Sequence, residues 1–245
     1  MNPHHSVIWR ARYTCRYVYQ RLSDGRILNL MVIFDDRIDA GRQLAAALSA
    51  YQGEPELVVL ALPRGGVPVA AEVAAALRAS LDVLVVRKIG TPFQPELAMG
   101  AVASGGVTII NKDVTRVTGV TAEQIEAATQ QAQAELAEKE SRYGEVPKAA
   151  TLEGRTVILV DDGVATGATM RAAIAAARAR QASKVVVAVP TAAAATARVL
   201  AEEADQLICL ETPEPYIAVG CWYRKFGQVS DDEVAAILAR ADDHG

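Results

Sequence analysis

Short apolar runs alternate with helical patterns along most of the chain. The runs are rich in Val, Leu and Ile and are flanked by Gly, Pro or charged residues, which is typical of strands buried in a parallel sheet. The expected strands are 57–62, 82–86, 157–160, 184–189 and 206–210. Helices are expected before, between and after them at 35–51, 67–79, 168–180, 192–203 and 230–241. This alternation predicts an α/β fold with a doubly wound, mainly parallel sheet and helices on both faces.

The middle of the chain departs from that alternation. Residues 89–97 contain one glycine and two prolines, so we expect a loop there. The short apolar runs 98–103 and 107–111 flank Gly105-Gly106 and predict a hairpin. A long polar helix is then expected over residues 121–142, because Thr121 and Gln124 have the spacing of a capping box. We assign this helix no catalytic role.

The two ends of the chain have compositions of their own. Residues 1–30 hold five arginines against a single acid, and their tyrosines follow no helical or strand period. We therefore expect 1–30 to be a basic, poorly ordered extension and 31–245 to form the domain. A transit segment, or residues that precede a natural start at Met31, are the alternatives. Near the other end, residues 216–226 concentrate aromatic side chains in a chain with only 5% of them, which predicts a small C-terminal hood-like segment.

Composition and charge exclude several classes of protein. A net charge of -4 and a pI near 5.5 argue against a general binder of nucleic acid or anionic membranes. No apolar stretch approaches the roughly 20 residues needed to span a bilayer. Three widely spaced cysteines favour the reducing cytoplasm over a disulfide framework. All three histidines lie near the chain ends, which weighs against hydrolases and metal enzymes that need an interior imidazole.

The strongest chemical signal is the segment 157–169, where an apolar strand ends at Asp161 and Asp162 and a small-residue loop leads into a helix. Backbone N–H groups of such a loop, together with the positive end of a helix, form a site for a phosphate. The two carboxylates would repel a phosphate, but they can accept hydrogen bonds from adjacent hydroxyls. A ribose 5-phosphate unit therefore fits the segment. An aspartate pair that holds a metal, or an ordinary strand-to-helix turn, are the alternatives.

Two further places carry candidate anion-binding groups. The expected strand 57–62 is followed by Pro63-Arg64-Gly65-Gly66, where glycines allow a ligand close to the backbone and Arg64 can contact an anion. The expected strand 82–86 is followed by Arg87 and Lys88, at the carboxyl end where open α/β sheets bind ligands. A tight turn and solvated surface charge would use the same residues.

The pattern of four apolar residues, two acids, two spacers and Ala-Thr-Gly-Ala-Thr resembles the phosphoribosyl pyrophosphate (PRPP) motif of type I phosphoribosyltransferases. The resemblance implies that Asp161 and Asp162 bind the ribose hydroxyls. It implies that the 5-phosphate is bound by Ala165, Thr166, Gly167, Ala168 and Thr169. It also implies that Gly65 and Gly66 lie at the pyrophosphate and that 89–97 is the mobile loop over PRPP. From Met31 onward, the chain most resembles bacterial members of the family whose acceptor is undefined.

The same resemblance implies a reaction. PRPP would bind with Mg²⁺, with Asp161 and Asp162 as candidate protein ligands, and Arg64, Arg87 and Lys88 would neutralise the departing pyrophosphate. Family members are commonly dimers, so a homo-oligomer is expected. Alternatives are a PRPP- or nucleotide-sensing protein without turnover, and a hydrolase or phosphatase that uses Asp161.

The acceptor is left open by the motif. Hypoxanthine and guanine enzymes carry an aspartate at the position of Ala165, which assists proton transfer at the purine. Aromatic residues of the hood-like segment are the candidates for stacking on a planar acceptor, with Trp222 first and Tyr223 beside it. The alternative for these aromatics is that they pack the hood-like segment itself.

Overall fold

The computed structural model describes residues 7–8, 16–21, 27–143 and 151–242. Six parallel strands form its central sheet, in the order β1-β11-β10-β9-β4-β5. Their bounds are β1 Val7–Ile8, β4 Leu57–Ala61, β5 Ser80–Val83, β9 Thr156–Val160, β10 Lys184–Thr191 and β11 Gln206–Glu211. All five pairings between neighbours are parallel. The predicted parallel sheet is confirmed.

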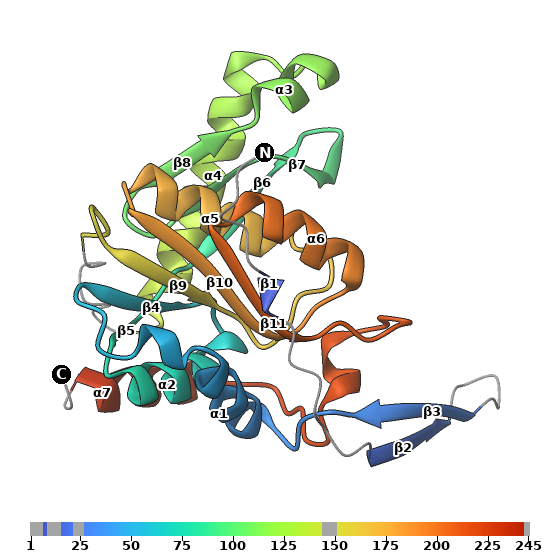
Figure 1. Ribbon diagram of the computed structural model, residues 1–245. Coiled ribbons are helices and arrows are strands. Elements are labelled where there is room, and N and C mark those ends of the chain that lie inside the picture. The colour runs from blue at the N-terminus through green and yellow to red at the C-terminus, as the bar shows by residue number, and fades with distance from the viewer. Residues whose placement is uncertain (1–6, 9–15, 22–26, 144–150, 243–245) are drawn as a thin grey trace.

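Helices cover both faces of this sheet (Figure 1). Helices α1 (Arg37–Ala47), α2 (Gly66–Leu77) and α7 (Asp231–Asp242) pack on one face, and α5 (Ala168–Ala179) and α6 (Ala194–Glu203) pack on the other. Successive side chains of each strand enter opposite layers, so Val59 and Ile158 join the core under α1 and α2. Leu60 and Leu159 join the core under α5 and α6. Strands buried on both faces explain the continuous apolar runs of the sequence.

The chain reverses its direction of travel across the sheet between β4 and β9. It runs outward from β4 to β5, then returns to β9 on the other side of β4 and continues to β10 and β11. Ala61 is paired with Val160, and the Leu62 N–H donates to the Val160 carbonyl at 2.8 Å, so both strands end at the same level. Such a switch point leaves a crevice beyond the carboxyl ends of the two strands.

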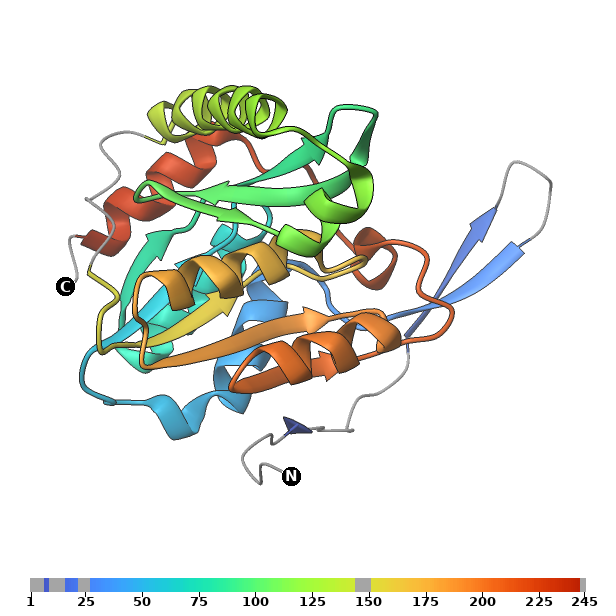
Figure 2. The same cartoon turned by 90° about the horizontal axis from the view of Figure 1, so that it is seen from above.

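A second sheet of three antiparallel strands stands beside the first, in the order β6-β7-β8. Its strands are β6 (Val86–Thr91), β7 (Gln94–Ala103) and β8 (Val107–Ile110), and the predicted hairpin at Gly105-Gly106 joins the last two. Helix α4 (Ala122–Ser141) packs on β6 and β7, and α5 packs on all three strands (Figure 2). Thr121 and Gln124 form the predicted capping box of α4. A short helix that we did not predict, α3 (Lys112–Thr118), joins this sheet to α4.

Two expectations for the region after β5 were wrong. Residues 89–97 are not a loop, because most of them belong to β6 and β7, which turn at Pro92 and Phe93. The pairing shifts register at Gly90, where a Cβ would lie 2.4 Å from the Pro95 carbonyl oxygen. A bulge therefore accounts for the glycine and proline that suggested a loop. Arg87 and Lys88 do not end a strand of the central sheet but lie inside β6.

The N-terminal part of the chain, where an extension over residues 1–30 was expected, also contains strands that the sequence did not predict. Besides β1, the strands β2 (Arg16–Arg21) and β3 (Ile27–Val32) pair with each other as an antiparallel hairpin. The hood-like segment contains the short helix η2 (Val219–Trp222), and another short helix, η1 (Ser49–Tyr51), follows α1. Phe34 and Tyr223 form an isolated parallel bridge, so the segment before α1 lies against the hood-like segment.

Candidate active site

Two loops meet in the crevice at the switch point. Residues 63–66 follow β4, and residues 161–167 follow β9. A Cβ on Gly65 would lie 2.0 Å from Asp162 Oδ2, and a Cβ on Gly66 would lie 2.6 Å from the Val160 carbonyl oxygen. Only glycine fits at these two positions, so the loops are packed backbone against carboxylate. The peptide bond between Pro63 and Arg64 is cis.

Hydrogen bonds fix the inner side of the loop before α5, and the outer side of this loop is exposed. The Val164 N–H donates to the Thr191 carbonyl at 2.9 Å, and the Thr196 hydroxyl donates to the Ala165 carbonyl at 2.6 Å. Gly167 has φ of 79°, and a Cβ there would meet Thr196 at 2.6 Å. On the outer side of the loop, Ala165, Thr166, Ala168 and Thr169 are exposed. The N-cap position of α5 is Gly167, which supplies no side-chain cap, so the first N–H groups of the helix are left for another acceptor.

The paired carboxylates occupy different environments. Asp162 is 8% exposed, and its Oδ2 accepts a hydrogen bond from Arg37 Nε at 2.8 Å. Arg37 lies at the start of α1, donates to the Gly227 carbonyl and stacks over the Phe226 ring at 3.8 Å. Asp161 is partly buried, and its Oδ1 accepts from the Asp162 N–H at 2.8 Å. Asp162 is therefore paired with a cation, whereas the hydrogen bonds given for the Asp161 carboxyl group are to its own neighbour, Asp162.

Burial raises the pKa of both carboxyls. For Asp161, burial is the largest cause and the charge of Asp162 is the next, so its pKa lies well above the usual range. For Asp162, burial raises the pKa while the Arg37 guanidinium opposes it. Two adjacent carboxylates whose ionised forms are disfavoured by burial favour a ligand that brings hydrogen-bond donors or positive charge.

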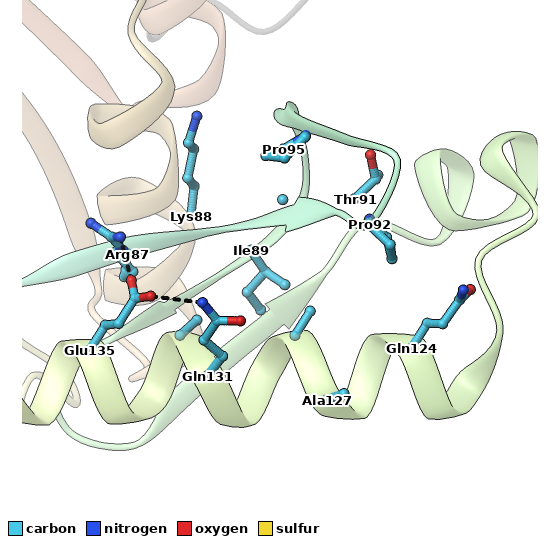
Figure 3. A pocket seen from close by; sticks show the side chains of 13 residues that line it. Arg87, Lys88, Ile89, Thr91, Pro92, Pro95, Gln124, Ala127, Gln131 and Glu135 are labelled. Atoms are coloured by element: carbon cyan, nitrogen blue, oxygen red, sulfur yellow. Dashed lines mark hydrogen bonds and ion pairs between the residues drawn. The ribbon is translucent and has the colours of Figure 1, made fainter.

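The predicted cations are arranged unevenly around this crevice. Arg64 Nη1 lies 3.7 Å from Asp231 Oδ1 at the start of α7. Arg87 forms an ion pair with Glu135 of α4, whereas Lys88 points away from α4 and pairs with Glu96 of β7 at 2.8 Å (Figure 3). Arg87 and Lys88 are neighbours in a strand, so their side chains leave on opposite sides. The geometry thus separates Lys88 from Arg87.

A groove of about 560 Å³ continues from Arg87 between the β6–β7 hairpin and α4 (Figure 3). Ile89, the two prolines of the hairpin and alanines of α4 form its apolar lining. Gln124, Gln131 and Glu135 contribute polar groups from α4.

The aromatic residues of the hood-like segment are buried. Trp222 is 3% exposed and Tyr223 is 4% exposed, so neither ring offers a free face to a planar acceptor. The Tyr223 ring lies 5.3 Å from that of Phe34, and its hydroxyl donates to the Asp162 carbonyl at 2.5 Å. Burial thus favours the alternative that both side chains pack the hood-like segment. The Tyr223 hydroxyl also anchors the loop that carries Asp162.

Arg37 and Asp231 are site residues that the sequence did not indicate. Arg37 is one of the charges in the helix that starts after Asp35-Asp36, and nothing in its spacing links it to Asp162, 125 positions away. Asp231 lies in the acidic first turn of α7, where a favourable interaction with the helix dipole would be a sufficient reason for an acid.

The part of the chain described by the structure contains no group of three or more His, Cys, Asp or Glu residues placed to hold a metal. Asp161 and Asp162 remain as a pair of oxygen ligands. Mg²⁺ is usually bound by one or two carboxylates together with water and substrate phosphates, so this pair suits a Mg²⁺ that arrives with a polyphosphate ligand.

Replacing Arg37 by Ala should destabilise the protein strongly, because Asp162 would stay buried without its partner. We expect a loss of about 3 kcal/mol in the free energy of unfolding, measured by urea denaturation. The matched control is Arg116→Ala, which removes an exposed pair with Asp113 and should change stability by no more than about 0.5 kcal/mol. Equal effects of the two substitutions would contradict the role given to Arg37.

Replacing Asp161 by Asn should stabilise the protein at neutral pH. An acid whose pKa is higher in the folded than in the unfolded state binds more protons when folded, so it costs stability as the pH rises above its ordinary value. Asn keeps the oxygen that accepts from the Asp162 N–H and removes the charge. The melting temperature should rise by a few degrees, since about 1 kcal/mol corresponds to roughly 2–4 °C at this size.

That gain should shrink as the pH is lowered, because the Asp161 carboxyl is then protonated in both states. Glu202→Gln, at an exposed position of α6, should show no such pH-dependent difference. A melting temperature of Asp161→Asn below that of the unsubstituted protein at neutral pH would refute the assignment.

Comparison with known proteins agrees with this geometry. The model of the phosphoribosyl transferase domain family matches residues 32–223. A Mycobacterium tuberculosis protein named "Putative phosphoribosyl transferase" is 51% identical over 211 residues, in two strains. The match covers 86% of this chain and 47% of that protein, so the chain spans about half the length of these relatives. A crystal structure of TT1426 from Thermus thermophilus has a TM-score of 0.79 at 42% identity, over 85% of this chain and 99% of that one.

No helix among the described residues is long and apolar enough to cross a membrane. The domain match begins at the end of β3 and ends within the hood-like segment, and it includes both loops of the crevice. With the parallel sheet, the paired carboxylates and the loop before α5, these findings place the chain in the phosphoribosyltransferase family.

Proposed function

We propose that the protein binds PRPP with Mg²⁺ and transfers its 5-phosphoribosyl group to a nitrogenous acceptor, with release of pyrophosphate. The observation that carries the proposal is the meeting of the 63–66 loop with the 161–167 loop at the switch point. One loop offers glycines and an arginine, and the other offers two carboxylates and an uncapped helix start. A sugar that bears a phosphate at one end and a pyrophosphate at the other matches this arrangement. The helix start suits the phosphate, the carboxylates suit the sugar hydroxyls, and the loop with the glycines and the arginine suits the pyrophosphate.

Each loop has one role in the proposed complex. Residues 165–169 bind the 5-phosphate through backbone N–H groups and the hydroxyls of Thr166 and Thr169. Asp161 and Asp162 accept hydrogen bonds from the ribose hydroxyls, and Arg37 and Tyr223 hold Asp162 in place. Gly65 and Gly66 let the pyrophosphate approach the backbone.

The cations act on the leaving group. The bond between the anomeric carbon and pyrophosphate breaks, a bond from that carbon to the acceptor nitrogen forms, and the nitrogen gives up its proton to solvent water. Arg64 and Arg87 stabilise the negative charge of pyrophosphate as it develops. Lys88 points away from α4, so we give it a supporting role. It adds to the positive electrostatic potential around the groove without contacting the leaving group.

Mg²⁺ would neutralise part of the pyrophosphate charge when bound, with Asp161 and Asp162 as its protein ligands and PRPP oxygens as the others. The raised pKa of both carboxyls fits this arrangement, because an arriving cation relieves the cost of their ionised forms.

The acceptor is proposed only by class. Ala165 leaves the loop without an acid that could assist proton transfer, and the buried Trp222 does not offer a stacking surface. A nucleobase or another nitrogen heterocycle is the first class to test. We further propose, by family resemblance, that the protein works in the cytoplasm as a dimer.

Pyrophosphate release measured with PRPP, Mg²⁺ and a panel of purines, pyrimidines and other nitrogenous compounds tests the proposal. At least one acceptor should give acceptor-dependent release, and Asp161→Asn and Asp162→Asn should both lower turnover and PRPP affinity. Removing hydrogen bonds to a charged acceptor should cost roughly tenfold or more in affinity. Glu202→Gln should behave like the unsubstituted protein.

Other outcomes would reject the proposal in favour of a different class. Tight PRPP binding without release for any acceptor would indicate a sensor that keeps the fold without turnover. Covalent trapping of phosphate on Asp161, without PRPP-dependent release, would indicate a hydrolase or phosphatase. Unchanged kinetics in both aspartate variants would refute the site itself.

A further inference from the structure

Helix α4 carries a lysine close to two of the arginines near the candidate site. Lys139 lies in the last turn of α4, and its side chain is partly buried. Among the residues that the structure describes, its ammonium group makes no hydrogen bond or ion pair. A lysine of intermediate exposure without a carboxylate partner can bind an anionic ligand through its ammonium group.

The neighbours of Lys139 along α4 fix where it lies. Glu135 is one turn earlier on the same side of the helix, and it forms the ion pair with Arg87 shown in Figure 3. Arg142 is three residues later, and its Nη1 lies 3.6 Å from Asp231 Oδ2. Asp231 in turn lies 3.7 Å from Arg64. Lys139 therefore lies on α4 between Glu135, which contacts Arg87, and Arg142, which contacts Asp231. Asp231 is the residue beside Arg64.

Three cations from three elements thus lie near one another, because the charges of Arg64 and Arg87 both act on Lys139. Arg64 comes from the loop after β4, Arg87 from β6 and Lys139 from α4. Arg64 and Arg87 each have a carboxylate close by, whereas Lys139 has none within ion-pair distance among the described residues. An excess of positive charge that faces a site for a polyanion is the arrangement expected of a pyrophosphate pocket.

We propose that Lys139 is a third cation of the pyrophosphate pocket and binds the pyrophosphate group directly. The assignment rests on the proposed function for the identity of the ligand, and it extends that function to a helix outside the loops of the motif. The lysine ammonium is a compact point charge, so it can bind an anion without the fixed planar geometry that an arginine guanidinium requires.

The electrostatics around Lys139 agree with this assignment. Burial lowers its pKa, and the positive charges of Arg64 and Arg87 lower it further, while Asp231 and Asp161 act in the opposite direction. A bound polyanion would counter the two arginines and favour the protonated lysine. The charged and titratable groups around Lys139 are Glu135, Arg142 and Tyr143 at the end of α4, Arg87 from β6, Arg64, Asp161 and Asp231.

Calorimetric titration of the full chain with inorganic pyrophosphate and, separately, with PRPP, both with Mg²⁺, tests the inference. The variants are Lys139→Gln and Lys139→Arg, and Lys112→Gln at an exposed position of α3 is the control. Lys139→Gln should weaken pyrophosphate binding roughly tenfold to a hundredfold, as expected for loss of a charged hydrogen bond. Lys139→Arg should restore most of the affinity, and Lys112→Gln should not change it.

Two further readouts separate binding from a structural role. Lys139→Gln should melt no lower than the unsubstituted protein, because the variant removes a charge that is repelled by Arg64 and Arg87. The affinity for pyrophosphate should also fall at alkaline pH as Lys139 loses its proton, relative to Lys139→Arg, which keeps its charge.

The two ligands distinguish the failure of each proposal. Pyrophosphate binding that is absent, or equal in Lys139→Gln and the unsubstituted protein, would overturn the assignment of Lys139. Pyrophosphate binding that depends on Lys139, without any binding of PRPP, would support the assignment and reject the proposed transferase.

Discussion

The site depends on two strands of the central sheet ending at the same level. Ala61 of β4 pairs with Val160 of β9, and the chain departs from these two strands in opposite directions across the sheet. The loops that follow therefore share one crevice, and glycines at 65 and 66 let them touch. A slip of one residue in this register would turn every side chain of a strand to the other core, so two fully buried layers hold the alignment.

Placing two carboxylates in that crevice has a cost that the surrounding structure offsets unequally. Asp162 is held by Arg37 and, through its carbonyl, by Tyr223, whereas Asp161 has a backbone N–H and the repulsion of its neighbour. Among the described residues, the ammonium group of Lys139 has no ion-pair partner either. Hydroxyls and a pyrophosphate on one ligand could satisfy both Asp161 and Lys139.

The sequence predicted those features that are local in the chain. The buried strands, the glycine loop after β4 and the loop before α5 follow from runs of neighbouring residues, and the fold and family were confirmed on them. The strands in 89–97 were missed, because a bulge uses the same glycine and proline as a loop. The antiparallel sheet also moved Arg87 and Lys88 out of the central sheet and onto opposite sides of a strand.

The residues that support the site from a distance could not be predicted. Arg37 reaches Asp162 across 125 positions, and Lys139 lies near Arg64 and Arg87 only because α4 packs on β6 and β7. Such contacts arise from tertiary packing and leave no spacing in the sequence. For Trp222, an aromatic cluster can mark either a binding face or a small core, and its burial favours the core.

In the proposed complex the two loops form one site for one ligand. Hydrogen exchange of backbone amides with and without PRPP and Mg²⁺ reports on each loop separately. Ligand should slow exchange in residues 64–67 and in residues 163–169 together. Protection of only one loop, or of neither, would contradict it.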